Sequence, residues 1–338
     1  MTIDPDSDNS PDLTFGGTLR IPVVAAPMFL VSTPAMTLAS CGSGIVGSFP
    51  AHSTRTREVF VEWLDEIDEG ITALASSGNR PAPYAVNLVV HRSNPRYDGD
   101  LAVCKEREVA IVLTSKGAPE EVFDEIHGWG GIAFHDVASP RHAEKALEAG
   151  ADGLIAVCGG AGGHTGTINP FALVSEIRAM SDAPIIVAGG INHGRSILAA
   201  QAMGGDLAYV GTHLIAAEES RANDDYREHL IAAASTDVLL SAALDGAPAN
   251  WLIPSLERAG IDIDELAVTR PGEIVTPSGS DAKKRYNGVW SAGHGVGAIA
   301  ASRPLASIVD QLVEEYDAAR DRLEGAAEVY SEPRSGSA

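Results

Sequence analysis

The feature that most constrains how this chain can fold is an alternation of short apolar runs with longer segments of helical period. Helical spacing of apolar residues is found, for example, at 55–76, 119–127, 139–149, 170–180 and 194–203. The apolar runs have the length of buried strands and lie at 21–26, 45–48, 84–90, 109–114, 131–135, 153–157, 185–188 and 207–211. Short strands that alternate with helices are typical of a parallel sheet wrapped by helices.

A succession of eight such β/α units predicts a (β/α)8 TIM barrel. An open, doubly wound sheet shows the same alternation with fewer strands, so the prediction depends on the count. After residue 212 the alternation stops, and helical patterns at 226–234 and 305–323 flank a stretch interrupted by Pro and Gly. We therefore expect a C-terminal helical elaboration over the barrel mouth.

The sequence divides into four parts on this reading. Residues 1–18 are acidic and lack the apolar segment of a signal peptide, so we expect a disordered tail. Residues 19–220 are expected to form the barrel and 221–330 a helical C-terminal subdomain. Residues 331–338 are expected to be a second disordered tail.

Charge and cysteine content exclude several classes of protein. The chain has 24 Lys and Arg against 46 Asp and Glu, a formal net charge of −22, with 45% hydrophobic residues. An acidic surface without a basic patch repels phosphate backbones and anionic lipids, so neither nucleic acid nor membrane is expected as a partner. The three cysteines are far apart in sequence, which predicts no disulfide or zinc site and favours the cytoplasm. Oligomeric state is open, with a homo-oligomer as one alternative.

The active site of a TIM barrel is built at the carboxyl ends of its strands. Small and polar residues follow the strands here: Ala25, Ala26, Pro27 and Met28 after the first, Asn87 and His91 at the third, His135 at the fifth, Ala188, Gly189 and Gly190 at the seventh, and Gly211 and Thr212 at the eighth. Glycines after the last two strands, with a short helix N-terminus, offer backbone N–H groups to a phosphate. The alternative is that they only turn each strand into its helix.

The loop after the sixth strand, 158–166, reads CGGAGGHTG. Five glycines in nine residues exceed the need of one turn and would let a flat ring lie close against the backbone of the loop. His164 would then be aimed at that ring. The simpler alternative is a flexible loop with a surface histidine.

A second glycine pattern carries no such meaning. Residues 42–47 match G-x-G-x-x-G, but that fingerprint must follow a strand and open a helix. Here it follows a helical segment and enters a strand, so we reject a dinucleotide-binding interpretation.

Together, AAPM after the first strand, VNL in the third, AGGHTG after the sixth, VAGGI at the seventh and AYVGT at the eighth resemble the nitronate monooxygenase (2-nitropropane dioxygenase) family of FMN-dependent TIM barrels. The resemblance covers roughly 22–220, and WSAGHGVG at 290–297 is similar to a C-terminal signature of that family. It implies a flavoprotein oxidoreductase that converts nitronates and O2 to carbonyl compounds and nitrite.

The resemblance also implies roles for single residues. His164 would be the catalytic base. The FMN would be held by Ala25, Ala26, Pro27, Met28, Asn87, Gly162, Gly163, Ala188, Gly189, Gly190, Gly211 and Thr212. Many relatives carry Lys at the end of the fifth strand, where Asp136 aligns, and Glu or Cys where this chain has Gly160. The missing cation leaves the electron donor of the flavin open.

Two other functions fit the same loops. An NAD(P)H-dependent flavin oxidoreductase acting on quinones or an enoyl thioester would need the same FMN site. A non-catalytic barrel that binds a phosphate ligand would leave His164 incidental. The sequence does not separate these three.

Other chemistry-bearing residues have simpler interpretations. His91, His135 and the pair Gly293 and His294 are candidates for the substrate pocket. For His91 and His135, a hydrogen-bonded or solvated histidine is the simpler interpretation. For His294, that interpretation and a catalytic role have equal weight. No metal site is expected, because His135 and Asp136 are adjacent in a strand and would point to opposite faces.

Overall fold

The computed structural model describes residues 12–91, 94–117, 120–244, 246–268 and 288–331. Eight parallel strands form one sheet in the order β1-β9-β8-β6-β5-β4-β3-β2. Their bounds are β1 Val23–Ala25, β2 Gly47–Pro50, β3 Tyr84–Val89, β4 Ile111–Ser115, β5 Ile132–Val137, β6 Gly153–Val157, β8 Ile185–Ala188 and β9 Leu207–Val210. Each corresponds to one of the expected runs.

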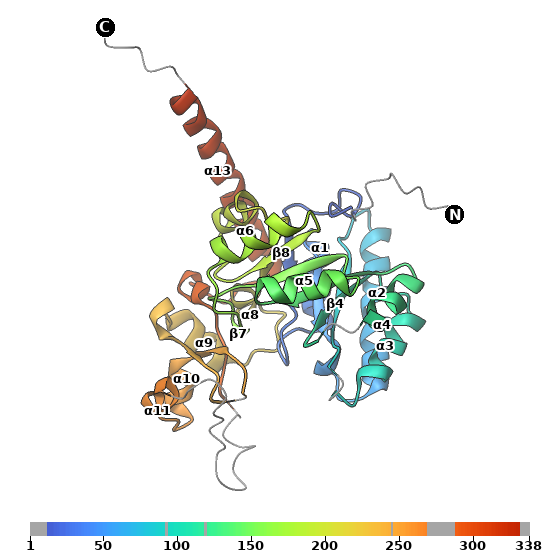
Figure 1. Cartoon of the computed structure of the whole chain (residues 1–338), viewed down its shortest axis with the longest axis horizontal. Helices are drawn as coiled ribbons and strands as arrows, with labels where there is room; N and C mark the ends of the chain where they lie inside the picture. Colours follow the sequence, from blue (N-terminus) through green and yellow to red (C-terminus); the bar gives the residue numbers. More distant parts are fainter. Residues whose placement is uncertain (1–11, 92–93, 118–119, 245, 269–287, 332–338) are drawn as a thin grey trace.

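The sheet closes between its first and second strands. The Ala25 N–H donates to the Val46 carbonyl at 2.8 Å, and the Val46 N–H donates to the Val23 carbonyl at 3.0 Å. This pairing completes a ring of parallel strands covered by helices (Figure 1). The predicted TIM barrel is therefore confirmed.

Period-two alternation decides which side chains fill the barrel. One buried cluster takes residues from the eight strands or their flanks, and so marks the interior: Val24, Val46, Ala85, Ile111, Leu113, Phe134, Ile155, Ile186 and Leu207. Their neighbours in sequence belong to a second cluster that includes helix residues such as Phe123 and Ile126. Apolar residues on both faces explain why the strands read as continuous runs.

Helices follow the strands on the outside of the barrel. Their bounds are α1 Pro34–Gly42, α2 Arg57–Ser76, α3 Tyr97–Glu106, α4 Glu120–Gly128, α5 Pro140–Glu148, α6 Pro170–Met180, α7 Gly194–Ala202 and α8 Thr212–Ile215. Several begin at a side-chain cap, such as Ser139, which accepts from the N–H of His142. The glycine pattern at 42–47 lies between the end of α1 and the start of β2, as expected for a non-functional match.

The segment before β1 is more ordered than its composition suggested. Residues 12–18, which we expected in a disordered tail, form a turn in which the Asp12 carboxylate accepts from the N–H groups of Thr14 and Gly16. Leu13 and Phe15 pack against the barrel-interior cluster. The rest of the expected N-terminal tail, 1–11, lies outside the described residues.

The C-terminal part is not purely helical, and that expectation was wrong in one respect. Strands β10 (Val238–Ser241) and β11 (Ala249–Leu252) pair antiparallel, and β7 (Gly163–His164) from the sixth barrel loop joins them. Short runs such as VLLS and ANWL carry little period-two signal, which is why the pattern gave only helices. The helical elements here are α9 Asp224–Ala232, η2 Ser235–Asp237, α10 Ile253–Arg258, α11 Ile263–Val268, η3 His294–Ala298 and α13 Leu305–Ser331.

Aromatic stacking fixes the segment that leads into η3. The Trp290 ring stacks on Tyr226 at 4.9 Å between centroids, and the guanidinium of Arg258 lies over Trp290 at 3.9 Å. The Tyr226 hydroxyl donates to the carbonyl of Ser291. Stacking and cation–π contacts of this kind anchor the start of the Gly-rich segment to α9 and α10.

Helix α13 returns the chain to the barrel. Its first turns bury Leu305, Ile308, Val309 and Leu312 against α7 and α1, and its later part extends away from the body of the protein (Figure 1). In the described part of the chain, none of the helices has the length and apolar character needed to cross a lipid bilayer.

Candidate active site

The loop after β6 and the Gly-rich segment after residue 290 meet at the barrel mouth. The His294 N–H donates to the Gly160 carbonyl at 2.9 Å, and the Gly293 N–H donates to the Thr212 Oγ1 at 2.9 Å. A Cβ on Gly162 would lie 2.8 Å from the Gly293 nitrogen, so only glycine allows this approach. Three segments far apart in sequence therefore form one wall.

His164 is held by the small antiparallel sheet. Its β7 strand pairs with β11, placing His164 opposite Ala249 and Gly163 opposite Asn250. The neighbouring Thr165 N–H donates to the Pro248 carbonyl at 3.0 Å. His164 is exposed to solvent.

Asn250 was not singled out from the sequence, yet it supports this loop. Its side chain is 1% exposed, and its Nδ2 donates to the Ala161 carbonyl at 2.7 Å. Its Oδ1 is buried without a hydrogen-bond partner among the described residues. Only the pairing of β7 with β11 reveals this role, because nothing in the local pattern ANWL marks it.

The loop after β1 lies beside the end of β9. The Ala26 N–H donates to the Val210 carbonyl at 2.9 Å, and the Met28 N–H donates to Ser32 Oγ at 2.9 Å. A Cβ on Gly211 would lie 3.3 Å from the Ala26 Cβ. The segment that contains Pro27 thus adjoins the Gly211–Thr212 turn, as the predicted site requires.

The ends of β8 and β9 supply backbone donors. The N–H groups of Gly190 and Thr212 have no hydrogen-bond partner within the described parts of the chain. Gly189 and Gly190 both have left-handed φ values, 129° and 69°. Unpaired N–H groups at the mouth of a barrel suit an anion such as phosphate.

The N-terminus of α7 does not take part in such a site. The Glu315 carboxylate of α13 accepts from the Gly194 N–H at 2.9 Å and from His193 Nδ1 at 3.2 Å. A carboxylate therefore already balances the positive end of this helix. The donors that a phosphate could use are therefore the N–H groups of Gly190 and Thr212, after β8 and β9.

Polar residues line the top of the barrel interior. Asn87 continues the interior face of β3 beyond Ala85, is buried, and donates from Nδ2 to the Leu113 carbonyl at 2.9 Å. Asp136 continues the interior face of β5 beyond Phe134 and is half-buried. Burial raises the pKa of Asp136 to about 7.

Tyr209 of β9 faces the same space. Burial, and secondarily the charge of Asp136, holds its pKa well above the usual range. The top layer of the barrel is therefore weakly polar, and near neutral pH it carries at most a partial negative charge.

One predicted pocket residue lies elsewhere. His135 points outward from β5: its Nδ1 lies 2.7 Å from Thr114 Oγ1, and its ring packs edge-on against Phe123 of α4. Burial lowers its pKa to about 4, so it is a neutral residue of the helix–sheet layer and lies away from the mouth. His91 is exposed just past the end of β3. By contrast, the Gly293–His294 pair adjoins the sixth loop.

Cys158, at the start of that loop, is an unreactive thiol. Its side chain is buried, and burial raises its pKa to about 12. A thiol that stays protonated at neutral pH is a poor nucleophile.

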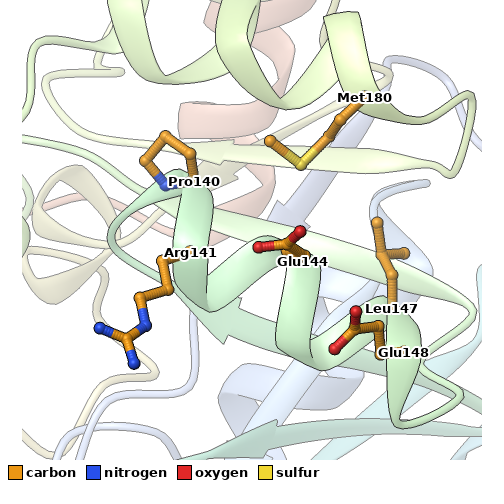
Figure 2. A pocket seen from close by; sticks show the side chains of 6 residues that line it. All are labelled: Pro140, Arg141, Glu144, Leu147, Glu148 and Met180. Carbon is orange, nitrogen blue, oxygen red and sulfur yellow. The ribbon is translucent and has the colours of Figure 1, made fainter.

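A separate hollow lies on the outer helical layer. It has a volume of about 390 Å³ and is lined by residues of α5 and α6: Pro140, Arg141, Glu144, Leu147, Glu148 and Met180. Figure 2 shows these side chains on the outside of the two helices. None of them belongs to the mouth.

Comparisons with known proteins identify the family of the chain. The sequence model of the family described as nitronate monooxygenase matches residues 81–315. The chain therefore belongs to the nitronate monooxygenase family, and it is an enzyme of an oxidoreductase class.

Individual relatives are more distant. The chain is 27% identical over 361 residues to a nitronate monooxygenase of Paraburkholderia phytofirmans, covering 89% of this chain and 94% of that protein. It is 28% identical over 244 residues to a (3aS,4S,5R,7aS)-5-hydroxy-7a-methyl-1-oxo-octahydro-1H-indene-4-carboxyl-CoA dehydrogenase of Rhodococcus jostii, covering 71% of this chain and 65% of that protein.

A solved structure supports the fold. The nitroalkane oxidase of Streptomyces ansochromogenes superposes with a TM-score of 0.75 at 24% identity, covering 91% of this chain and 99% of that one. At this identity the likeness extends to the architecture alone.

The buried carboxyl predicts a pH-dependent stability. The folded protein holds the Asp136 proton more tightly than the unfolded chain, so wild-type stability falls as pH rises from about 4 to about 7. We expect Asp136→Asn to remove this loss, and its stability relative to wild type to be about 1–3 kcal/mol higher at pH 8 than at pH 4.5, after allowing for partial solvent screening. Urea unfolding of wild type and variant at pH 4.5 and at pH 8 measures this stability difference. Asp124→Asn, on the exposed face of α4, is the control. A stability difference that is the same at both pH values would contradict the burial of Asp136.

Proposed function

We propose that this protein binds FMN in the barrel mouth and oxidises alkyl nitronates with O2 to a carbonyl compound and nitrite. The observation that carries the proposal is the convergence of His164, the glycines of the sixth loop and the unpaired N–H groups of Gly190 and Thr212 at one face. Family membership supports the reaction class.

The residues present fit a flat ring with a phosphate. A Cβ on Gly163 or Gly190 would meet nothing within 4 Å, so both face open space, and their φ values of 66° and 69° favour glycine. Gly162 is instead packed against Gly293, which makes it a structural support of the wall. The ring would lie along Gly163, and the phosphate would bind to the N–H groups of Gly190 and Thr212.

His164 is the base of this proposal. The C–H of the α-carbon of a nitroalkane is acidic. The unprotonated ring nitrogen of a neutral imidazole within reach can take up that proton. When bound, FMN supplies the two-electron chemistry that a protein side chain lacks. The chain would hold the substrate in the mouth between His164 and the flavin ring and would limit the access of water to it.

A second candidate function is supported by one relative. The dehydrogenase of Rhodococcus jostii is named for a carboxyl-CoA substrate. An NAD(P)H-dependent flavin oxidoreductase acting on a thioester or quinone would use the same mouth. The third alternative, a non-catalytic phosphate-binding barrel, is disfavoured because the chain belongs to an enzyme family.

Replacing the base should separate proton abstraction from oxidation. We expect His164→Asn to lower kcat/KM for neutral nitroethane by about 100-fold or more, because a general base contributes at least that factor. The loss on preformed ethylnitronate should be smaller, since that substrate has already lost its proton. His294→Asn tests the neighbouring histidine, and His142→Asn on the exposed face of α5 is the control. Full activity of His164→Asn on nitroethane would exclude His164 as the base.

A methyl group at the proposed phosphate site should block the cofactor. Gly190→Ala and Gly78→Ala both place a side chain at a left-handed φ with nothing within 4 Å, so each should cost about 1 kcal/mol of stability. Only Gly190→Ala should raise the FMN dissociation constant, by about tenfold or more, because its methyl group would occupy the phosphate position. Fluorescence titration with FMN compares them. Equal FMN affinity in the two variants would place the phosphate elsewhere.

A further inference from the structure

Asp136 has no counter-charge among the described residues at the top of the barrel. Strand β5 alternates between the barrel interior, where Ile132 and Phe134 lie, and the helix layer, where Ala133 and Val137 lie. This period puts the Asp136 carboxyl in the interior at the carboxyl end of the strand. Within the described chain it forms no hydrogen bond or ion pair.

Within the part of the chain that the structure describes, Tyr209 is the ionisable group whose pKa responds to the charge of Asp136. The strands hydrogen-bonded to β5, namely β4 and β6, present apolar Leu113, Ile155 and Val157 to the interior. Tyr209 lies on β9, and the charge of Asp136 helps to raise the pKa of its hydroxyl group, after burial as the main cause. Nearby β3 contributes the neutral amide of Asn87.

Cations at the mouth act on a different residue. The charges of Arg96 and Lys116 help to lower the pKa of His52, after burial as the main cause. Burial alone shifts the titration of Asp136. A partly open polar group with no protein partner is one that a ligand can satisfy.

We propose that Asp136 is protonated when the barrel mouth holds its flavin and donates a hydrogen bond to the ring, so that binding FMN takes up one proton. This inference rests on the proposed cofactor. The proton comes from solvent and stays on the carboxyl oxygen, and no other bond is made or broken.

The physical reason is desolvation. A ring that covers the mouth removes the remaining water from a carboxyl that is already half-buried and unpaired, which disfavours its charged form. The neutral acid can donate to a carbonyl oxygen or a ring nitrogen, whereas the carboxylate would face those acceptors with repulsion. Asp136 is thus a positioning residue that links cofactor affinity to pH.

The test is the FMN dissociation constant of the full-length holoenzyme, measured from the fluorescence of FMN released on dilution at pH 7, 8 and 9. We expect the wild-type dissociation constant to rise about 25-fold or more over this range relative to that of Asp136→Asn, because uptake of about one proton weakens binding by close to tenfold per pH unit above pH 7. Asp124→Asn should follow wild type. The ratio of the wild-type dissociation constant to that of Asp136→Asn at each pH cancels the titration of the FMN phosphate and of the histidines, which both proteins share.

A second measurement covers the case in which Asp136→Asn does not fold. Calorimetric titration of wild type with FMN at pH 8 in two buffers of different ionisation enthalpy gives the number of protons taken up. A value near one supports the proposal, and a value near zero overturns it.

The outcomes separate the two proposals. FMN that binds with the same pH dependence in wild type and Asp136→Asn contradicts the role of Asp136 and leaves the cofactor in place. FMN that fails to bind at any pH contradicts the cofactor itself, and the role of Asp136 with it.

Discussion

The closure of the parallel sheet is the constraint on which the rest of the structure depends. Two hydrogen bonds between Val46 and the residues of β1 join the first strand to the second. Once the ring is closed, all eight carboxyl ends meet at one face, and residues as distant in sequence as Asn87, Gly190 and Thr212 lie at the same end of the barrel. An open sheet with the same strands would leave these groups spread along an edge.

The second requirement is that the C-terminal part completes the mouth. The sixth loop is too rich in glycine to hold one conformation by itself. Strand β11 pairs with Gly163 and His164, and the His294 N–H donates to the Gly160 carbonyl, so both segments hold the loop. The stack of Tyr226 on Trp290 then fixes the start of that segment. The proposed base and its support thus come from parts of the chain that are far apart in sequence.

The sequence predicted the strands well because buried parallel strands are short, apolar and bounded by glycine or polar residues. It predicted the glycine and histidine loops because they follow those strands directly. It did not predict β10, β11 or Asn250, whose importance comes only from pairing with β7. The outward direction of His135 was also hidden, since it depends on the exact phase of β5.

In the proposed function a nitronate reduces FMN in the barrel mouth, and one measurement tests this directly. The absorbance of the purified protein with FMN is recorded without oxygen after addition of propionate 3-nitronate and, separately, of NADH. We predict that the nitronate bleaches the flavin absorbance and that NADH leaves it unchanged. Bleaching by NADH and not by the nitronate would contradict the account and favour the reductase.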